Sequence, residues 1–370
     1  MRAPIWRDLQ CSLRENSLLI LFMLAYSLVP WILASRVTLP AAPYYDIVIA
    51  YVGFAGMSAI AIFAAFALWY LYHTRLLKVP HFQAEAARRI RYDFLTRERI
   101  LLALPVLLLW PIFASAFTFI KSSIPLVQPY YFDATLHDWD RAIHFGIDPW
   151  RLLQPLLGYT WITYTVNIGY TIWFLVMGAS LSLQAGATGN RKRRMQFLLT
   201  MTLAWALIGN LAATLISSAG PCYYALVTGD SAPYGALMDY LHNVAATVAA
   251  DLHLPFTATG LQDMLWNSYV TNNFKVANGI SAAPSMHIAS SWIIARLAWS
   301  MGKRARQFGC LFLLMIFIGS IHLGWHYAVD GYLAIAGAWV LWRFTGWLLD
   351  FPAVQAFLWP RRTGNVSPAS

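Results

Sequence analysis

Charged side chains are scarce in this sequence: 11% of its 370 residues are Asp, Glu, Lys or Arg, against roughly 25% in soluble domains. Acidic residues are the rarer kind, 16 against 26 Lys and Arg, which gives a formal net charge of +10. In a chain with so few charges, this excess indicates loop residues that set membrane orientation, and it argues against a nucleic-acid partner. With 59% hydrophobic residues and 17 Trp, 19 Tyr and 21 Phe, the composition is that of a membrane protein.

Cysteine is also rare. Cys11, Cys222 and Cys310 are odd in number and far apart in the sequence. Such a set supports neither a disulfide framework nor a zinc site. The sequence also lacks internal repeats and any polar stretch long enough for a soluble domain. The apolar runs therefore decide the fold class.

These runs predict an all-α integral membrane protein with about eight transmembrane helices. The first run is too long for the apolar region of a signal peptide, and a second run follows closely, so we expect it to remain as a span. The last three runs are short for a hydrocarbon core of about 30 Å, which takes about 20 residues. The predicted spans cover residues 17–34, 45–72, 100–120, 159–183, 197–217, 285–300, 308–321 and 330–349.

Two segments between the spans, 121–158 and 219–281, are too polar to cross a membrane. Their many aromatic residues favour the membrane–water interface. The basic, amphipathic segment 74–99 predicts a surface that faces water or lipid headgroups. We expect three parts: two N-terminal spans with the basic segment (1–99), a membrane-embedded core (100–350) and a cytoplasmic tail (351–370).

The Lys and Arg residues predict the orientation of the spans, because they accumulate on the cytoplasmic side. With the N-terminus inside, most basic residues fall on inner segments, and both termini are cytoplasmic. We expect a multi-pass protein of a bacterial cytoplasmic membrane, with its polar motifs at the outer face. The basic residues left on outer segments are Arg36, Lys121, Arg141, Arg151 and Lys275.

Two short motifs carry residues suited to chemistry. In Pro284-Ser285-Met286-His287, Pro and Ser are residues that open helices, so His287 should stand on a first turn, beside N–H groups that suit an anion. In HLGWHYAVD, His326 and Asp330 would share a face if the segment were helical. An imidazole held by a carboxylate makes a good base or nucleophile. Together the two motifs indicate phosphoryl chemistry.

The motifs resemble those of the phosphatidic acid phosphatase type 2 superfamily. PSMH stands for its Pro-Ser-Gly-His element, and HLGWHYAVDG stands for its His-Tyr-x-x-Asp element. The variant Met286, the stretch YYFDATLHDWDRAIHFGIDPW and the number of spans are more similar to the inositol phosphorylceramide synthase-like branch. The resemblance covers roughly residues 100–350. It implies a six-helix catalytic core that acts on a phospholipid or lipid phosphate.

The resemblance also implies a role for each motif residue. His326 would attack phosphorus and form a phosphohistidine, while Asp330 would hold its other nitrogen. His287 would protonate the leaving group and then deprotonate the lipid alcohol acceptor or water. Pro284 and Ser285, with neighbouring N–H groups, would bind phosphate oxygens. Neither a metal nor a cofactor is implied.

Three positions that are basic in the family are not basic here: Ala213, Gly220 and Ser320. We expect Lys275, on an outer segment, to bind the phosphate instead. Because a phosphodiester carries less charge than a monoester, the loss of cations favours a diester donor with a lipid alcohol acceptor. A phosphatase for phosphatidate or polyprenyl (di)phosphate is the alternative, since the two reactions differ only in what attacks the phosphohistidine.

Two other functions place histidines inside membranes. A proton-coupled transporter would relay protons through His and Asp, but here the polar residues cluster at one face. A haem-binding protein would need facing His pairs at matched depth, which a visible absorption spectrum would detect. For His322 we expect core packing or hydrogen bonding, and for Asn167 and Asn210 we expect contacts between helices.

Overall fold

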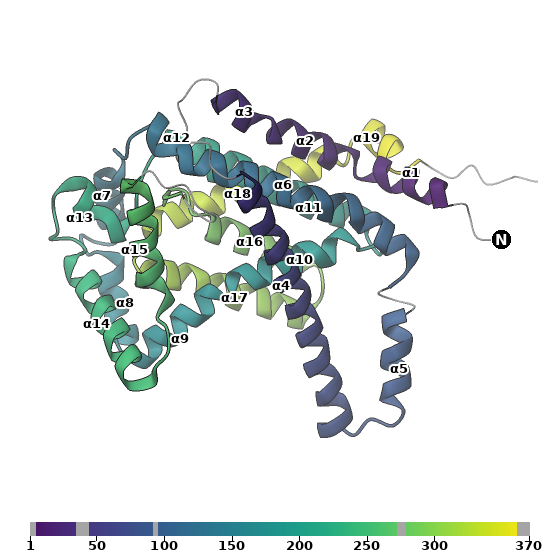
Figure 1. The fold of residues 1–370 in the computed structure, drawn as a ribbon, viewed down its shortest axis with the longest axis horizontal. Coiled ribbons are helices and arrows are strands. Elements are labelled where there is room, and N and C mark those ends of the chain that lie inside the picture. The colour runs from purple at the N-terminus through teal and green to yellow at the C-terminus, as the bar shows by residue number, and fades with distance from the viewer. Residues whose placement is uncertain (1–4, 35–43, 92–94, 272–278, 361–370) are drawn as a thin grey trace, which may run out of the picture.

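The fold is built from helices throughout the part of the chain that the structure describes. The computed structural model describes residues 5–34, 44–91, 95–271 and 279–360, and long helices form a bundle with short helices at one end (Figure 1). The all-α prediction is confirmed for these residues. The main helices are α1 (Ile5–Glu15), α2 (Ser17–Ser27), α3 (Val29–Ala34), α4 (Tyr44–Leu71), α5 (Phe82–Arg89), α6 (Arg97–Val127), α7 (Asp133–Ile143), α8 (Pro149–Leu157), α9 (Thr160–Thr171), α10 (Trp173–Ala185), α11 (Arg191–Ala206), α12 (Ala213–Leu215), α13 (Tyr224–Thr228), α14 (Gly235–Leu252), α15 (Thr257–Val270), α16 (Met286–Trp299), α17 (Lys303–His322), α18 (Ala328–Leu348) and α19 (Pro352–Leu358).

Several helices can cross a membrane, as predicted. Among the described residues, five helices are long and apolar enough, and up to seven spans result if each of two bent pairs counts as one. The bent pairs are Ile5–Glu15 with Ser17–Leu33, at 65°, and Ala328–Leu348 with Pro352–Leu358, at 78°. The predicted count of eight is therefore not confirmed. The five helices cover Ile47–Leu76, Arg97–Val127, Thr160–Ala185, Arg191–Leu215 and Lys303–His322.

The difference from eight lies in α16, the helix that follows PSMH. It has 14 residues, which at 1.5 Å per residue span only about 21 Å. It contacts α11, α17 and α18, and its residues Ile288 and Ile293 are fully buried. Its apolar sequence therefore reflects enclosure by other helices, which an apolar run alone does not distinguish from contact with lipid.

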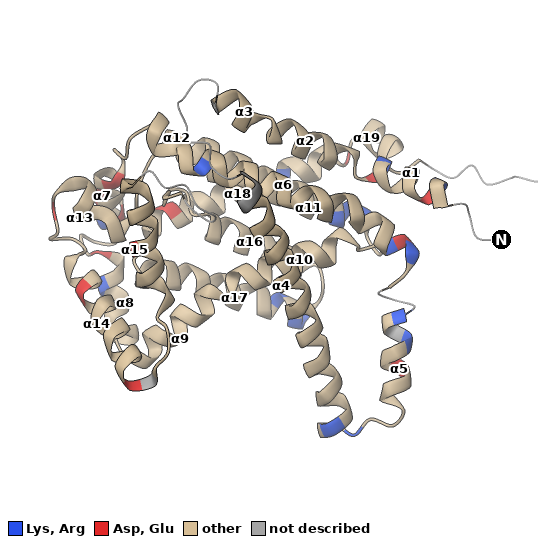
Figure 2. Ribbon diagram, in the orientation of Figure 1, with Lys and Arg blue, Asp and Glu red and all other residues tan. Residues whose placement is uncertain are grey.

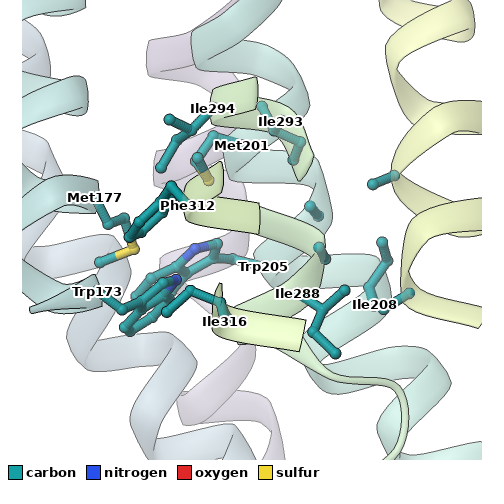
Figure 3. Close-up of a cluster of buried hydrophobic side chains, with 14 of the residues drawn as sticks. Trp173, Met177, Met201, Trp205, Ile208, Ile288, Ile293, Ile294, Phe312 and Ile316 are labelled. Carbon is teal, nitrogen blue, oxygen red and sulfur yellow. The ribbon is translucent and has the colours of Figure 1, made fainter. Parts of the chain in front are cut away.

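The core of the bundle surrounds this short helix. Lipid tails are as apolar as these side chains, so close packing rather than escape from water is what holds such helices together. The packing also fixes the start of α16 relative to its neighbours. The side chains that meet there (Figure 3) include Trp173, Met177, Met201, Trp205, Ile288, Ile293, Ile294, Phe312 and Ile316.

The short helices α7, α8, α13, α14 and α15 gather at one end of the bundle (Figure 1, left). They belong to the two segments that were predicted not to span, and none of them is among the membrane-capable helices. Helix α7 buries Asp133, Leu136 and Asp140, and it packs against α13 and α18. It therefore lies across the ends of the bundle helices.

Charge is distributed unevenly along the bundle. Figure 2 shows Lys and Arg gathered toward α5 and the start of α11, while the end formed by α7, α8, α13 and α14 carries mainly acidic residues. Helices α4 and α5 extend away from the bundle at the bottom of the view (Figure 1). Helix α5 belongs to the predicted basic segment 74–99, and Gln83, Ala84, Ala87 and Arg88 are exposed on it.

Candidate active site

Three loops meet at the bundle end that carries the short helices. They comprise residues 216–220, 280–285 and 323–327. The N–H of Ala282 donates to the carbonyl of Ser218 at 2.9 Å, and that of Cys222 donates to the carbonyl of Gly324 at 2.9 Å. These bonds hold the starts of α16 and α18 close together. The two sequence motifs therefore meet at one place.

His326 lies in the third of these loops, with only 6% of its surface exposed. Its Nδ1 atom is 2.8 Å from the carbonyl oxygen of Ala282 and 3.5 Å from Oδ2 of Asp330. A carbonyl oxygen only accepts hydrogen bonds, so the proton of the neutral imidazole lies on Nδ1. The Nε2 atom then keeps its lone pair, which is the form that a nucleophile needs.

Asp330 approaches His326 in a different way from the one predicted. Helix α18 begins at Ala328, so His326 precedes the helix and the two residues do not share a helical face. Asp330 lies in the first turn, and its Oδ2 accepts a hydrogen bond from the N–H of Tyr327 at 3.0 Å. Among the described residues its buried Oδ1 has no hydrogen-bond partner. The carboxylate thus faces the imidazole and can accept a further hydrogen bond at Oδ1.

His287 lies on the first turn of α16, as predicted from the residues before it. The centroid of its ring is 5.7 Å from that of His326. The ring also packs against Tyr170, at 4.9 Å, and Trp173, at 4.2 Å. These aromatic side chains hold the imidazole in place. The two histidines are therefore close enough to act on a single phosphoryl group.

Ser285 and Pro284 form the entry to α16. Ser285 is the N-cap, and its Oγ accepts a hydrogen bond from the N–H of Ile288 at 3.3 Å. Pro284 precedes it after a cis peptide bond. The first N–H groups of a helix have no partner within the helix, which suits them to an anion. Lys275, the cation predicted to bind phosphate, lies outside the described residues.

Asp133 of α7 ties the loops together, and the sequence patterns did not reveal this role. Its Oδ1 accepts hydrogen bonds from Ser218 Oγ at 2.7 Å, from the Gly220 N–H at 2.8 Å and from the Tyr327 hydroxyl at 2.9 Å. Its Oδ2 accepts from the Ala219 N–H at 2.9 Å. One carboxylate therefore fixes the first loop and the residue that follows the candidate nucleophile.

Asp140, further along α7, holds the start of α18. Its two carboxylate oxygens accept hydrogen bonds from the N–H groups of Ala328, at 2.9 Å, and Val329, at 2.7 Å. The side chain thus acts as a helix cap donated by another helix. Burial raises the pKa of Asp140 above its ordinary value, while the two N–H donors oppose that shift. The cap positions the first turn of α18, which contains Asp330.

The cations at this end of the bundle differ in their surroundings. Arg141 and Arg151 lie 3.7 Å and 2.9 Å from the buried carboxylate of Asp148. Lys121, near the end of α6, forms none of the ion pairs found among the described residues, and its side chain lies against Gly279, just before the second loop. Lys121 is therefore a described cation that lies close to the second loop and pairs with no described carboxylate.

Of the three positions that lack the expected cations, Gly220 has no room for a side chain and the other two are fully buried. A Cβ atom at Gly220 would lie 2.9 Å from both the Cβ of Ala282 and the carbonyl oxygen of Trp325. Ser320 is fully buried, and its carbonyl accepts the N–H of Trp325 at 2.9 Å. Ala213 is also fully buried.

No other cluster suited to catalysis stands out in the described part of the chain. There, no group of three or more His, Cys, Asp or Glu side chains could hold a metal ion. The three cysteines are free. Burial raises the pKa of the Cys222 thiol, mainly because the charged form would lose its contact with water.

Comparison with known proteins identifies a family that matches this chain. A family model described as the PAP2 superfamily matches residues 134–345, more than half of the chain. The match begins in α7 and ends in α18, so it includes the three loops with His287, His326 and Asp330. Neither the comparison with curated proteins nor that with solved structures finds a match.

Proposed function

The chain belongs to the PAP2 superfamily, and on this basis we propose that it transfers the phospho-headgroup of a glycerophospholipid to a lipid alcohol, in the manner of inositol phosphorylceramide synthase-like enzymes. Members of the superfamily are lipid phosphatases or phosphotransferases, and several helices of this chain can cross a membrane. The observation that carries the proposal is the state of His326, whose Nδ1 is bound to Ala282 and whose Nε2 is left to react.

In the first half of the reaction, Nε2 of His326 attacks the phosphorus of the donor. The bond from phosphorus to the glycerol oxygen breaks, and His287 gives that oxygen a proton, so diacylglycerol leaves. The headgroup phosphate is then held on His326 as a phosphohistidine. Asp330, 3.5 Å from Nδ1, stabilises the positive charge that develops on the ring.

In the second half, a lipid hydroxyl attacks the same phosphorus. His287, now neutral, takes the hydroxyl proton, and the bond from phosphorus to Nε2 breaks. The lone pair returns to Nε2, and both histidines regain their starting states. The same residue serves as acid and then as base, as reversibility of the two half-reactions requires.

The choice of a diester donor follows from charge. Sites that cleave monoesters profit from several cations where oxyanion charge develops. Here Ala213 and Ser320 are buried without charge, and a side chain at Gly220 would collide with the next loop. Arg141 and Arg151 are occupied by Asp148. A donor with one negative charge fits these surroundings better than one with nearly two.

The distribution of charge supports catalysis at the outer face. Lys and Arg gather at the end of the bundle opposite the three loops (Figure 2), and basic residues favour the cytoplasmic side. We propose that both termini are cytoplasmic and that substrate reaches the loops from the outer leaflet. We further propose a division into residues 1–99, a catalytic core at 100–350 and a tail at 351–370.

We also propose that the reaction needs no metal, because two histidines and the start of a helix supply the nucleophile, the acid and the anion site. Activity should persist in the presence of a chelator. Orthovanadate, which mimics five-coordinate phosphorus, should compete with the donor. Activity that is lost on chelation and restored by a divalent ion would contradict the scheme.

The decisive experiment compares two donors in the same detergent. Purified protein is incubated with a phosphatidylinositol-type diester or a phosphatidate-type monoester, each with and without ceramide, and the products are identified by lipid mass spectrometry. We expect a higher kcat/KM for the diester, with the headgroup transferred to ceramide. Preference for the monoester with release of free phosphate would instead identify a lipid phosphatase.

A further inference from the structure

An apolar groove opens beside the candidate active site, between α4 and the pair α9–α10. Its volume of about 650 Å³ lies within the range of about 300–1,000 Å³ that is usual for ligand sites. The residues around it are mostly apolar or aromatic, which suits a hydrocarbon chain. The lining includes Tyr51, Phe54 and Met57 of α4 and Ile168, Phe174 and Met177 of α9 and α10.

Two contacts connect the groove with the histidines. Phe174, which lines the groove, packs edge-on against His287, with ring centroids 6.2 Å apart. Tyr51, on the opposite wall, has its hydroxyl 2.6 Å from the Oγ1 of Thr118 on α6. Lys121 follows Thr118 by three residues and therefore lies one turn further along the same face of α6. Side chains of the groove thus contact His287 on one side and, on the other, the turn of α6 that precedes Lys121.

Lys121 is placed as a ligand-binding cation would be. Its side chain packs against the backbone of Gly279, where an added Cβ would lie 3.1 Å from the lysine Cγ. Gly279 directly precedes the loop that contains Ala282 and Pro284. No carboxylate of the described chain pairs with the Lys121 ammonium. Lys121 lies within a membrane-capable helix, where a cation without a partner is costly and usually functional.

We propose that the groove and Lys121 together form the binding site of the phospholipid substrate, in which the groove takes one acyl chain and Lys121 binds the phosphate beside His287. The proposal rests on the proposed function for its substrate class. A phospholipid is the occupant that fits, because an apolar groove whose walls contact His287 and Thr118 lies next to the turn of α6 that carries a cation. Lys121 thereby takes the phosphate-binding role that the sequence had suggested for Lys275.

Binding can be measured without turnover in the His326→Ala protein. In that background we expect Lys121→Gln to weaken binding of a phosphatidylinositol-type lipid by about ten- to a hundredfold, the size of one hydrogen bond to a charged group. Lys121→Arg should keep affinity within a few-fold. Lys303→Gln, which removes an exposed lysine of α17, is the matched control and should change nothing. Diacylglycerol, which has no phosphate, should bind equally with and without Lys121→Gln.

The acyl chain can be located by photo-crosslinking. A phospholipid with a diazirine in its acyl chain should label the peptides around Phe54–Met57 and Phe174–Met177. Met57→Trp should fill the groove and remove this labelling. Phe63→Trp, at a position 71% exposed on the same helix and outside the groove, should leave it unchanged.

The outcomes test the lipid-binding site and the proposed headgroup transfer separately. If Lys121→Gln binds the phospholipid as tightly as its parent, or if the diazirine labels other helices, the proposal is wrong whatever the activity. If binding and labelling follow the expected pattern while the wild-type protein transfers no headgroup, the proposed function fails and the lipid site stands.

Discussion

His326 and Ala282 are joined by a 2.8 Å hydrogen bond between the imidazole Nδ1 and a backbone carbonyl, across 44 residues of sequence. Because the carbonyl accepts the Nδ1 proton, it sets the tautomer of the histidine. Asp330, at 3.5 Å from the same nitrogen, is then left to stabilise charge. The histidine and the aspartate should therefore differ in how much activity their loss removes.

Asp330→Asn should lower kcat by roughly 10²-fold, the usual size for one preorganised electrostatic contact. The Asn oxygen can still accept the N–H of Tyr327, so the variant should stay folded. His326→Ala should abolish turnover. The measurement is kcat with the diester donor, and thermal unfolding of each variant checks the fold. An Asp330→Asn protein as inactive as His326→Ala would mean that the carboxylate also sets the tautomer.

The acid role of His287 can be distinguished from the nucleophile role of His326 by comparing donors whose leaving groups do and do not need a proton. With the natural donor, His287→Ala should lose about 10²- to 10⁴-fold in rate, as expected for loss of a general acid. With a nitrophenyl phosphodiester, whose leaving group needs no proton, His287→Ala should still form the phosphoenzyme. His326→Ala should form none. Equal loss with both donors in His287→Ala would remove His287 from the acid role.

Gly220→Ala should destabilise the protein and inactivate it. The residue has φ +103°, and a Cβ would meet Ala282 and Trp325 at 2.9 Å. Gly302 is a matched control, because it has φ +109° with nothing within 4 Å. Gly302→Ala should show only the backbone strain, about 1–3 kcal/mol in the free energy of unfolding. Similar loss in both variants would show that the contact between loops does not matter.

Asp133→Asn should lower stability and kcat together. The carboxylate accepts hydrogen bonds from four donors, and an amide nitrogen in place of one oxygen would leave buried N–H or O–H groups unpaired, at about 1–3 kcal/mol each. Asp138→Asn changes an exposed aspartate on the same helix and should have no effect. The measurements are thermal unfolding and kcat. Normal kcat in Asp133→Asn would show that the loops hold their shape without it.

Sidedness can be tested in a background in which Cys11, Cys222 and Cys310 are replaced by Ser. An impermeant maleimide should label Ser231→Cys in intact cells, because residue 231 is exposed and lies at the end that we place outside. Gly189→Cys, at a site with open space around it, should react only after permeabilisation. The reverse pattern would overturn the proposed orientation.

Local chemistry could be predicted from the sequence where it depends on neighbours in the chain. Pro284 and Ser285 predicted the start of α16 and the place of His287, because capping is a property of a few adjacent residues. The expected hydrogen bond of His322 is also present, to Thr163 Oγ1 at 2.9 Å. The proximity of His326 and Asp330 was predicted correctly, but the two residues do not lie on one helical face. His326 precedes α18, and Asp330 caps the start of that helix.

Contacts between residues far apart in the sequence could not be predicted in this way. Asp133 and Asp140 lie in a stretch that supported the family resemblance but gave neither residue a role, and their partners are 85 to 194 residues away. The number of spans was uncertain for a related reason, since α16 is apolar through burial among helices. Lys121 counted only as an outer basic residue until the fold placed its side chain against Gly279, just before the loop that leads to His287.

The bond from Asp133 to Tyr327, across 194 residues, has a consequence for biosynthesis. The ribosome makes Asp133 long before any of its partners, and Tyr327 reaches it only when the last long helix of the bundle enters the membrane. The loop that contains His326 is therefore tied to the first loop only once the chain has been made as far as Tyr327.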